Sequence, residues 1–191
     1  MISRRELLVA VPALGLAACS HDPAPSFPAF RFEGSPLLFN LADISIDNRF
    51  SPLGEGHLEA DFDVSPETAL ENWVGDRLQA AGSSGRLVVT VTDASAVQER
   101  LSTTNGVEGL FRDEQGFKIT VRLGVDFVAD DPGRLSTART HVEVEKFKTL
   151  AKDVSFTERR QAYYSLSRSL IDDFDAKAVP ALRQHFRLFL G

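Results

Sequence analysis

Residues 117–127 read FKITVRLGVDF, in which apolar side chains alternate with polar or small ones from Phe117 to Phe127. Such a period of two is typical of a β-strand with one buried face and one solvated face. Asp130-Asp131-Pro132-Gly133 follows and reads as a turn. A returning strand is expected from Arg134 to about Phe147, so this region should form a β-hairpin.

The length of the hairpin loop predicts how its two strands pair. A four-residue loop over 130–133 would place Val121 opposite Val142 on the apolar face. On the polar face it would place Arg122 opposite His141. The apolar residues of the two strands then share one face, so the alternation and the loop length predict the same register.

Three further segments are expected upstream of the hairpin. Leu37 to Phe50 predicts a first strand, and Arg86 to Val97 predicts a second one. Between them, Ser65-Pro66-Glu67 places a capping hydroxyl, a proline and an acid in the order typical of a helix start. This helix is expected to run to about Ala81.

Ser155-Phe156-Thr157-Glu158 is a capping box that opens a long helix, which Pro180 should kink or split. Trp73 of the first helix is expected in the core, together with an apolar stripe on the second. The stripe comprises Tyr163, Leu166, Leu170, Phe174, Ala178, Leu182, Phe186 and Leu190. The element order predicts an α+β fold: a two-layer sandwich with a mostly antiparallel four-stranded sheet and two helices packed on one face. Residues 32–191 are expected to form this single domain.

The N-terminus has the three parts of a secretory signal. Arg4 and Arg5 form a basic region, residues 7–18 form an apolar run, and Ala18 precedes Cys19. A membrane-spanning helix needs about 20 apolar residues, and this run is shorter. We therefore expect a signal peptide over residues 1–18, cleaved between Ala18 and Cys19.

Leu16-Ala17-Ala18-Cys19 resembles the bacterial lipobox. The resemblance implies that Cys19 carries a diacylglycerol and, after cleavage, an N-acyl chain such as palmitate. Cys19 is the only cysteine of the chain, so lipidation also accounts for a thiol with no disulfide partner. Ser20 follows it, and the sorting rule of Gram-negative lipoproteins then implies the outer membrane, with the domain facing the periplasm.

Ser3-Arg4-Arg5-Glu6-Leu7-Leu8 also resembles the twin-arginine export motif. A pair of arginines is equally common in an ordinary basic region, and Glu6 is an unusual neighbour for the motif. Both export routes stay open at this point.

The composition describes an acidic protein. The net charge is −6, and it becomes −7 without residues 1–18, which hold two arginines and one glutamate. An acidic balance disfavours nucleic acid as a partner and disfavours broad electrostatic contact with anionic headgroups. Residues 19–31 contain three prolines and several small residues, and we expect them to form a lipidated tether.

Four segments resemble a family of uncharacterised alphaproteobacterial outer-membrane lipoproteins. They are residues 71–78, 93–97, 106–111 and 158–164. The element order is also similar to that of small lipoproteins that assist transport, such as the lipopolysaccharide-assembly lipoprotein and the auxiliary lipoproteins of lipid-trafficking ABC systems. The resemblance implies an envelope lipoprotein and no particular activity.

Motifs of known chemistry are missing from the sequence, which has no nucleophile elbow, phosphate-binding loop or dinucleotide fingerprint. Its four histidines are scattered, so neither a metal site nor another cofactor is expected beyond the covalent lipid. His57 lies in an acidic loop over 55–63 that could bind a hard cation, but the loop lacks the calcium-loop pattern. Asp172, Asp173 and Asp175 read as a solvated helix face.

The connection from Gln98 to Gly116 holds the best candidate contact site. Leu110 and Phe111 lie beside glycines there, and exposed apolar side chains on a loop often mark a partner contact. The alternative is that they fold back onto the core. We expect a non-catalytic, lipid-anchored module that assists an envelope transport or assembly system. A small-molecule or lipid-binding protein is the second hypothesis, and a hydrolase is the third.

Overall fold

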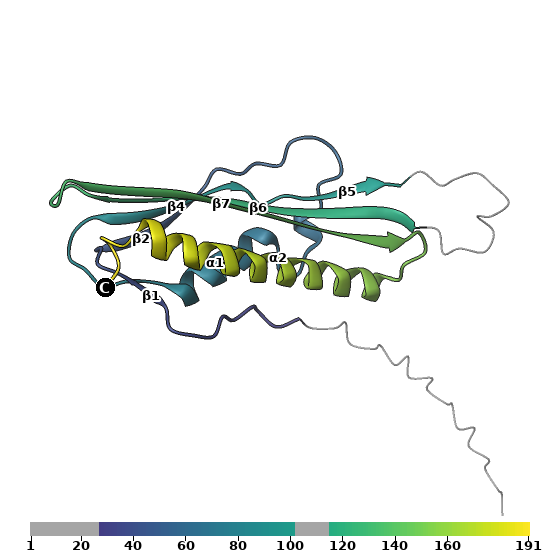
Figure 1. The fold of residues 1–191 in the computed structure, drawn as a ribbon. Helices are drawn as coiled ribbons and strands as arrows, with labels where there is room; N and C mark the ends of the chain where they lie inside the picture. The colour runs from purple at the N-terminus through teal and green to yellow at the C-terminus, as the bar shows by residue number, and fades with distance from the viewer. Residues whose placement is uncertain (1–26, 102–114) are drawn as a thin grey trace, which may run out of the picture.

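A long antiparallel hairpin dominates the computed structural model, which describes residues 27–101 and 115–191 (Figure 1). Strand β6 (Gln115–Asp131) pairs along most of its length with β7 (Ser136–Ala151). The predicted alternation in β6 is confirmed, because its inward residues are fully buried in the core. These are Ile119, Val121, Leu123, Val125 and Phe127.

The hairpin turn lies two residues later than predicted. Asp131 pairs with Ser136, so the loop comprises residues 132–135 instead of 130–133. Asp131 is the first residue of a β-turn, in which its carbonyl accepts from the Arg134 amide at 3.1 Å. Pro132 takes the second position of this turn, which its fixed φ favours. Leu135 ends the loop with a φ of 50°.

The predicted register is therefore wrong by four residues. Val121 lies opposite Lys146 and not Val142, and Arg122 lies opposite Glu145 and not His141. A shift by an even number keeps every side chain on its original face. The predicted faces of the two strands consequently hold although the predicted pairs do not.

The main sheet has five strands instead of the expected four. Three of its four strand pairings are antiparallel, as expected, and one is parallel, so the sheet is mixed. Strands β4 (Arg86–Asp93) and β5 (Ala96–Arg100) pair antiparallel with successive parts of β6, on the side opposite β7. The predicted single strand over 86–97 is thus two strands. Strand β2 (Asp43–Asn48) pairs with β4 in parallel. The long connection through a helix permits this parallel pairing, whereas a tight hairpin would force the antiparallel one.

A second, two-stranded parallel sheet accounts for the remaining differences from the prediction. It joins β1 (Leu37–Phe39) to β3 (Leu78–Ala80). The predicted first strand over 37–50 is therefore split between two sheets, and the predicted helix loses its last turn to β3. Helix α1 (Pro66–Arg77) ends at Arg77 and not near Ala81.

Residues near the C-terminus close this small sheet. Phe39 forms an isolated antiparallel bridge with Leu190, and the Asn40 amide donates to the Phe189 carbonyl at 2.6 Å. The Phe39 ring packs edge-on against Phe186 at a centroid distance of 6.0 Å. Segments from the two ends of the domain therefore share one hydrogen-bonded and apolar contact.

Both predicted helix starts are confirmed. Ser65 caps α1 by accepting from the Thr68 amide, and Ser155 and Glu158 form the capping box of α2 (Phe156–His185). Helix α2 runs through Pro180 without being split. Pro180 is exposed, so water can bind the carbonyl that the missing proline N–H leaves free. With the short 3-10 helix η1 (Glu59–Asp61), these are the helical elements of the described residues.

Both long helices lie on one face of the five-stranded sheet (Figure 1), so the α+β class is correct. Trp73 of α1 is fully buried between the layers, as predicted. Its ring packs edge-on against Phe174 of α2 and Phe127 of β6, at centroid distances of 5.1 and 6.2 Å. The three rings join both helices to the sheet.

Candidate functional site

The residues predicted to carry function from the sequence lie outside the described residues. This holds for the export arginines Arg4 and Arg5 and for Ala18 and Cys19 at the cleavage site. It also holds for the candidate contact residues Leu110 and Phe111. Their roles stay predictions. Within residues 27–101 and 115–191, no helix is both long and apolar enough to cross a membrane.

Residues 27–36 lie along α2, and we call them the strap. The Phe27 and Phe30 rings pack on Tyr164 of α2, at centroid distances of 4.7 and 5.0 Å. The Tyr164 hydroxyl donates to the Pro28 carbonyl at 3.2 Å. Phe30 is only 1% exposed, so the strap contributes to the hydrophobic core.

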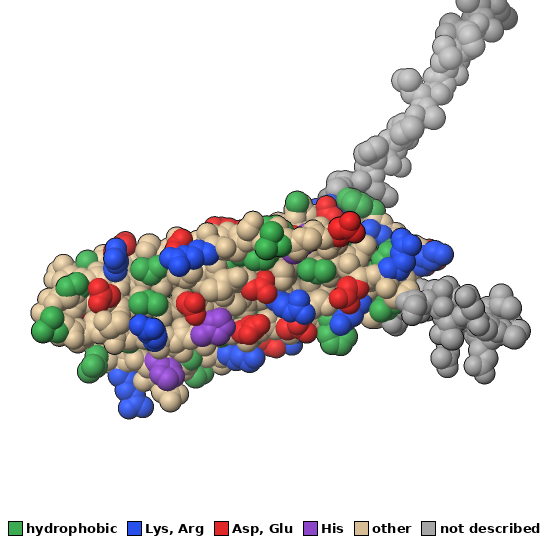
Figure 2. Space-filling view, turned by 90° about the horizontal axis from the view of Figure 1, so that it is seen from above, with side chains coloured by type: hydrophobic (Ala, Val, Ile, Leu, Met, Phe, Trp, Pro, Cys, Tyr) green, Lys and Arg blue, Asp and Glu red, His purple; other side chains and the backbone are tan. Residues whose placement is uncertain are grey.

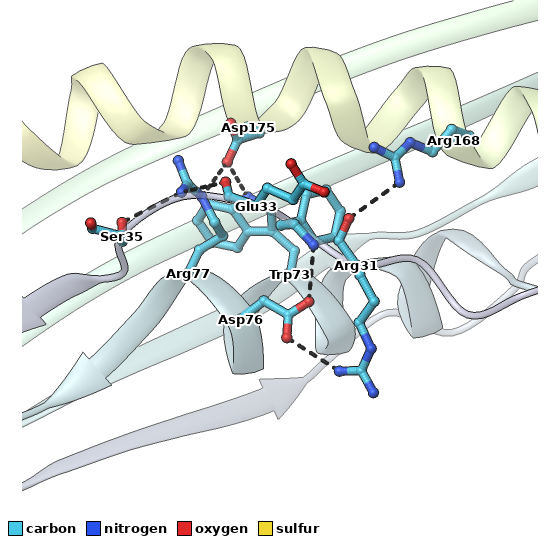
Figure 3. Close-up of polar contacts among 9 residues, drawn as sticks. Arg31, Glu33, Ser35, Trp73, Asp76, Arg77, Arg168 and Asp175 are labelled. Atoms are coloured by element: carbon cyan, nitrogen blue, oxygen red, sulfur yellow. Dashed lines mark hydrogen bonds and ion pairs between the residues drawn. The ribbon is translucent and has the colours of Figure 1, made fainter.

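Arg168 of α2 holds the middle of the strap. Its guanidinium lies 5.5 Å from the centre of the Phe30 ring and 5.4 Å from that of Phe32. The same group donates to the Arg31 carbonyl at 3.4 Å (Figure 3). One arginine therefore contacts three consecutive residues of the extended segment, two through cation–π contacts with their rings and one through an N–H donated to a backbone carbonyl.

Asp175 of α2 anchors the other side of the strap. Its Oδ1 accepts from Trp73 Nε1 at 2.7 Å and from Arg77 Nε at 2.8 Å. Arg77 in turn donates to the carbonyls of Glu33 and Ser35, at 3.3 and 3.5 Å (Figure 3). The carboxylate thus positions the cation that holds the strap backbone.

Asp76 of α1 completes this network. It accepts from the Phe32 amide at 3.1 Å and from the Arg31 side chain at 3.3 Å (Figure 3). The sequence assigned residues 19–31 to a tether, and residues 27–31 of that segment lie against the folded domain. The part of the chain between Cys19 and the domain surface is correspondingly short.

We predict that Arg168→Ala loosens the strap without unfolding the domain. It removes two cation–π contacts, worth roughly 0.5–1 kcal/mol each at exposed sites. Hydrogen exchange of the Phe32 amide should accelerate, while amides of β6 keep their protection. Asp172→Ala is the matched control, because Asp172 pairs with Arg168 at 3.0 Å and does not contact the strap rings. Equal exchange at Phe32 in both variants would contradict the assignment.

A cavity of about 520 Å³ opens beside the first turn of α2. It is open to solvent, and helix η1 and the connection between β7 and α2 also contribute to its wall. Its lining residues are Asp61, Val154, Phe156, Arg159, Arg160 and Tyr163. A second hollow of about 360 Å³ lies near the hairpin turn, between Asp43, Gly85, Arg86, Asp130 and Pro132.

The two arginines of the larger cavity differ in their partners. Arg160 forms an ion pair with Asp63, with 2.9 Å between Nε and Oδ2. Arg159 lies over the Phe117 ring at 5.9 Å and has no ion-pair partner among the described residues. Burial raises the pKa of the Tyr163 hydroxyl above its ordinary value, so this lining residue stays neutral at physiological pH. Sequence reasoning did not single out Arg159, Arg160 or Tyr163 as site residues.

Two of the histidines, His57 and His141, form hydrogen-bonded pairs with acids. His57 Nδ1 lies 2.7 Å from Glu59, whose carboxylate also accepts from the Ala96 amide. His141 Nδ1 lies 2.8 Å from its cross-strand neighbour Asp126. Within the described part of the chain, no three His, Cys, Asp or Glu side chains gather closely enough to hold a metal ion.

The pH dependence of the His57–Glu59 pair has a definite sign. The hydrogen bond to Glu59 raises the pKa of His57 above 6.5. A histidine whose pKa is raised by folding stabilises the protein fully below its unfolded pKa and loses this contribution as pH rises through its folded pKa. We therefore predict an NMR titration midpoint above 6.5 for His57, and a lower midpoint in Glu59→Gln. An unchanged midpoint in that variant would show that another group perturbs His57.

The three helix aspartates do not share one environment. Asp172 pairs with Arg168, and Asp173 pairs with Lys146 of β7 at 2.6 Å. These two fit the predicted solvated face with ion-pair support. Asp175 does not, because it accepts from the buried Trp73 indole.

The fold and the site together define an α+β domain with an N-terminal segment bound along its long helix. No protein-family model matches the chain, and no curated protein matches it. Among solved structures, the chain is similar to a minor lipoprotein from Acinetobacter baumannii, with 17% identity and a TM-score of 0.42 over 78% of this chain and 96% of that one. It is also similar to the PelC dodecamer from Paraburkholderia phytofirmans, with 14% identity and a TM-score of 0.20 over 73% and 90%. Neither likeness assigns this chain to a family.

Proposed function

We propose that this chain is a lipid-anchored envelope lipoprotein, and that its domain is a non-catalytic module assisting a transport or assembly system. The observation that carries the proposal is the strap. The strap binds the N-terminal segment to α2 from Phe27 onward, and Phe27 lies eight positions after Cys19. If Cys19 is anchored in the membrane, only a short segment separates the anchor from the folded domain.

The length of this segment limits the distance between the domain and the bilayer. Eight residues reach at most about 26–29 Å when fully extended, which is less than the length of α2. An anchored domain would therefore keep the Phe27 end near the bilayer and present its other surfaces to the periplasm. Restricted reach of this kind suits a protein that meets partners at the same membrane.

Support for the anchor comes from the sequence. The basic region, the short apolar run and the lipobox-like Leu16-Ala17-Ala18-Cys19 occur in the order that export and lipidation require. Ser20 after the cysteine favours the outer membrane. The twin-arginine route and the general secretory route fit this proposal equally well.

Substitution of Cys19 tests the anchor. In cells, the wild-type chain and a Ser20→Ala control should fractionate with membranes, and their intact mass should correspond to a chain beginning at Cys19 with acyl chains attached. Cys19→Ser should lose the acyl mass and leave the lipoprotein fraction. If Cys19→Ser fractionates and weighs as an acylated protein does, the lipoprotein proposal fails.

Site-specific cross-linking tests the accessory role. A photoreactive residue at Phe111 should capture a specific envelope protein, and one at Leu135 in the hairpin loop serves as a control for exposed positions. Leu135 is 93% exposed, so it reports random encounters. Isolation of the lipoprotein alone from solubilised membranes would count against the proposal.

The larger cavity supports a second candidate, a lipid-binding or small-molecule-binding lipoprotein. Its volume of about 520 Å³ falls in the range of ligand pockets. The cavity lies at the start of α2, beside η1. Native mass spectrometry should find a bound molecule of low mass if this candidate is right. Neither His57 nor His141 lines a cavity described above, so no observation favours the hydrolase hypothesis.

A further inference from the structure

The strap reaches the rim of the larger cavity. The Arg160 guanidinium lies 5.4 Å from the centre of the Phe27 ring and 5.7 Å from that of Phe156, and Phe156 and Arg160 both line the cavity. Phe27 is the first described residue of the chain. The segment that continues toward Cys19 therefore begins directly beside this cavity.

An exposed aromatic side chain stands at the same place. Phe156 occupies the first turn of α2 and is 73% exposed. Leaving a phenyl ring in water is unfavourable, and aromatic rings bind well at the boundary between lipid headgroups and acyl chains. Phe156 thus points to an apolar contact close to the predicted anchor.

Cations without ion-pair partners gather at this end, although the chain as a whole is acidic. Among the described residues, Lys118, Lys148, Lys152 and Arg159 form no ion pair. The contact of Arg159 with Phe117 and the approach of Lys152 to Gly116 place these two cations beside the start of α2. Lys148 lies opposite Ile119 in the same end of the hairpin, whereas Lys118 lies over Phe147 on the other face of the sheet. Figure 2, which views the sheet face opposite the helices, shows Lys and Arg side chains together with Asp and Glu side chains at this end of the domain.

The acidic groups at this end leave Arg159 available. Asp63 is paired with Arg160, and Glu158 is held in the capping box with Ser155. Asp61 lines the cavity with Arg159 and forms no ion pair with it. Because Arg160 is paired with Asp63, Arg159 is the guanidinium group of the cavity lining that has no ion-pair partner among the described residues.

We propose that the end of the domain around Phe156 rests on the surface of the bilayer, with the ring of Phe156 among the lipids and the phosphate of an anionic lipid headgroup bound by Arg159 in the cavity. This inference rests on the proposed anchor at Cys19. The domain would then have one fixed face toward the membrane instead of tumbling at the end of a tether.

A weak contact is sufficient for this orientation. A short flexible connection gives its two ends an effective concentration on the order of millimolar. An aromatic ring and one or two cations, which would not bind free protein to a vesicle, therefore suffice once the chain is attached. The acidic net charge opposes binding of the free domain and does not prevent this local contact.

The test attaches the chain chemically, so that it does not depend on lipidation in the cell. The chain beginning at Cys19 has a single thiol, which is coupled to a maleimide lipid in phosphatidylcholine vesicles, with or without phosphatidylglycerol. Phe156→Trp places an indole on the proposed contact, and Leu135→Trp places one in the hairpin loop as a matched exposed control. The native Trp73 is fully buried and supplies a constant background. Brominated phosphatidylcholine in the vesicles quenches an indole that enters the lipid.

Emission from the indole at position 156 should fall roughly twofold in anionic vesicles, whereas the indole at position 135 should be unaffected. Arg159→Gln should reduce the quenching at position 156 to the level found with phosphatidylcholine alone. Complete coupling without quenching at position 156, or equal quenching at both positions, would overturn the proposal. If the quenching at position 156 is the same with and without phosphatidylglycerol and is unchanged by Arg159→Gln, the assignment of the headgroup site is overturned. Because intact mass reports the coupling directly, none of these results depends on whether cells acylate Cys19.

Discussion

Replacement of Trp73 by alanine is expected to lower the free energy of unfolding by about 3–5 kcal/mol. The indole is fully buried and packs edge-on against both Phe127 and Phe174. Its removal leaves a cavity where α1, α2 and the sheet meet, because the surrounding rings cannot collapse into the space without moving a helix. It also leaves Asp175 without one of its donors.

Urea denaturation followed by far-ultraviolet circular dichroism measures this effect, since the variant lacks the tryptophan that fluorescence would report. Leu53→Ala is the control, because Leu53 is 86% exposed and its truncation should cost less than about 0.5 kcal/mol. Trp73→Phe should fall between the two, since it keeps most of the packing and loses the N–H. A loss below about 1 kcal/mol for Trp73→Ala would contradict the packing described here.

Asp175→Ala is expected to cost about 2–3 kcal/mol, the second-largest effect. It removes the acceptor of the Trp73 indole and the ion-pair partner of Arg77. The Arg77 side chain is only 13% exposed, so water cannot fully replace the carboxylate. The strap should loosen as well, because Arg77 holds the carbonyls of Glu33 and Ser35.

Two variants separate the charge from the hydrogen bonds in this cluster. Asp175→Asn keeps an acceptor for Trp73 and should cost less than Asp175→Ala. Asp172→Ala removes a carboxylate about one helical turn away on α2, in an exposed pair with Arg168, and should cost less than about 0.5 kcal/mol. Equal losses for Asp172→Ala and Asp175→Ala would show that Asp175 acts only as a surface charge.

The hairpin shows which parts of a sheet can be predicted from local sequence. Alternation in residues 117–127 determines which side chains face the core, and this part of the prediction is correct. The register depends instead on which residue begins the turn. Two adjacent aspartates precede Pro132, and the fixed φ of the proline selects Asp131 as the first turn residue. The prediction began the loop at Asp130 and therefore paired every residue of β6 with the wrong residue of β7. Each side chain nevertheless stays on its predicted face of the sheet.

Segments whose structure depends on distant partners could not be predicted. Residues 78–80 continue the sequence of α1 and have no strand pattern of their own. They become β3 because β1 lies beside them. Gly82 permits this approach, since a Cβ atom there would lie 2.4 Å from the Asn40 carbonyl carbon. The glycine indicates a helix end in the sequence, but not the strand before it.

The strap has a sequence feature, its three phenylalanines, that the proline-rich composition of the segment made easy to overlook. Residues 19–31 are rich in proline and small residues, which is typical of a solvated tether. Phe27, Phe30 and Phe32 are too apolar for that role, and their spacing could have suggested a bound segment. Their partners Tyr164 and Arg168 lie more than 130 positions away, so no local pattern identifies where the segment binds. The cavity was equally hidden, because η1 and α2 meet only in the folded chain.

The contact between Phe39 and Leu190 has a consequence for biosynthesis. These residues lie roughly 150 positions apart, and a ribosome adds about 5–20 residues per second. The segment that completes the sheet of β1 is therefore synthesised roughly 8–30 s after β1 itself. During that interval the nascent chain lacks the bridge that closes its native fold.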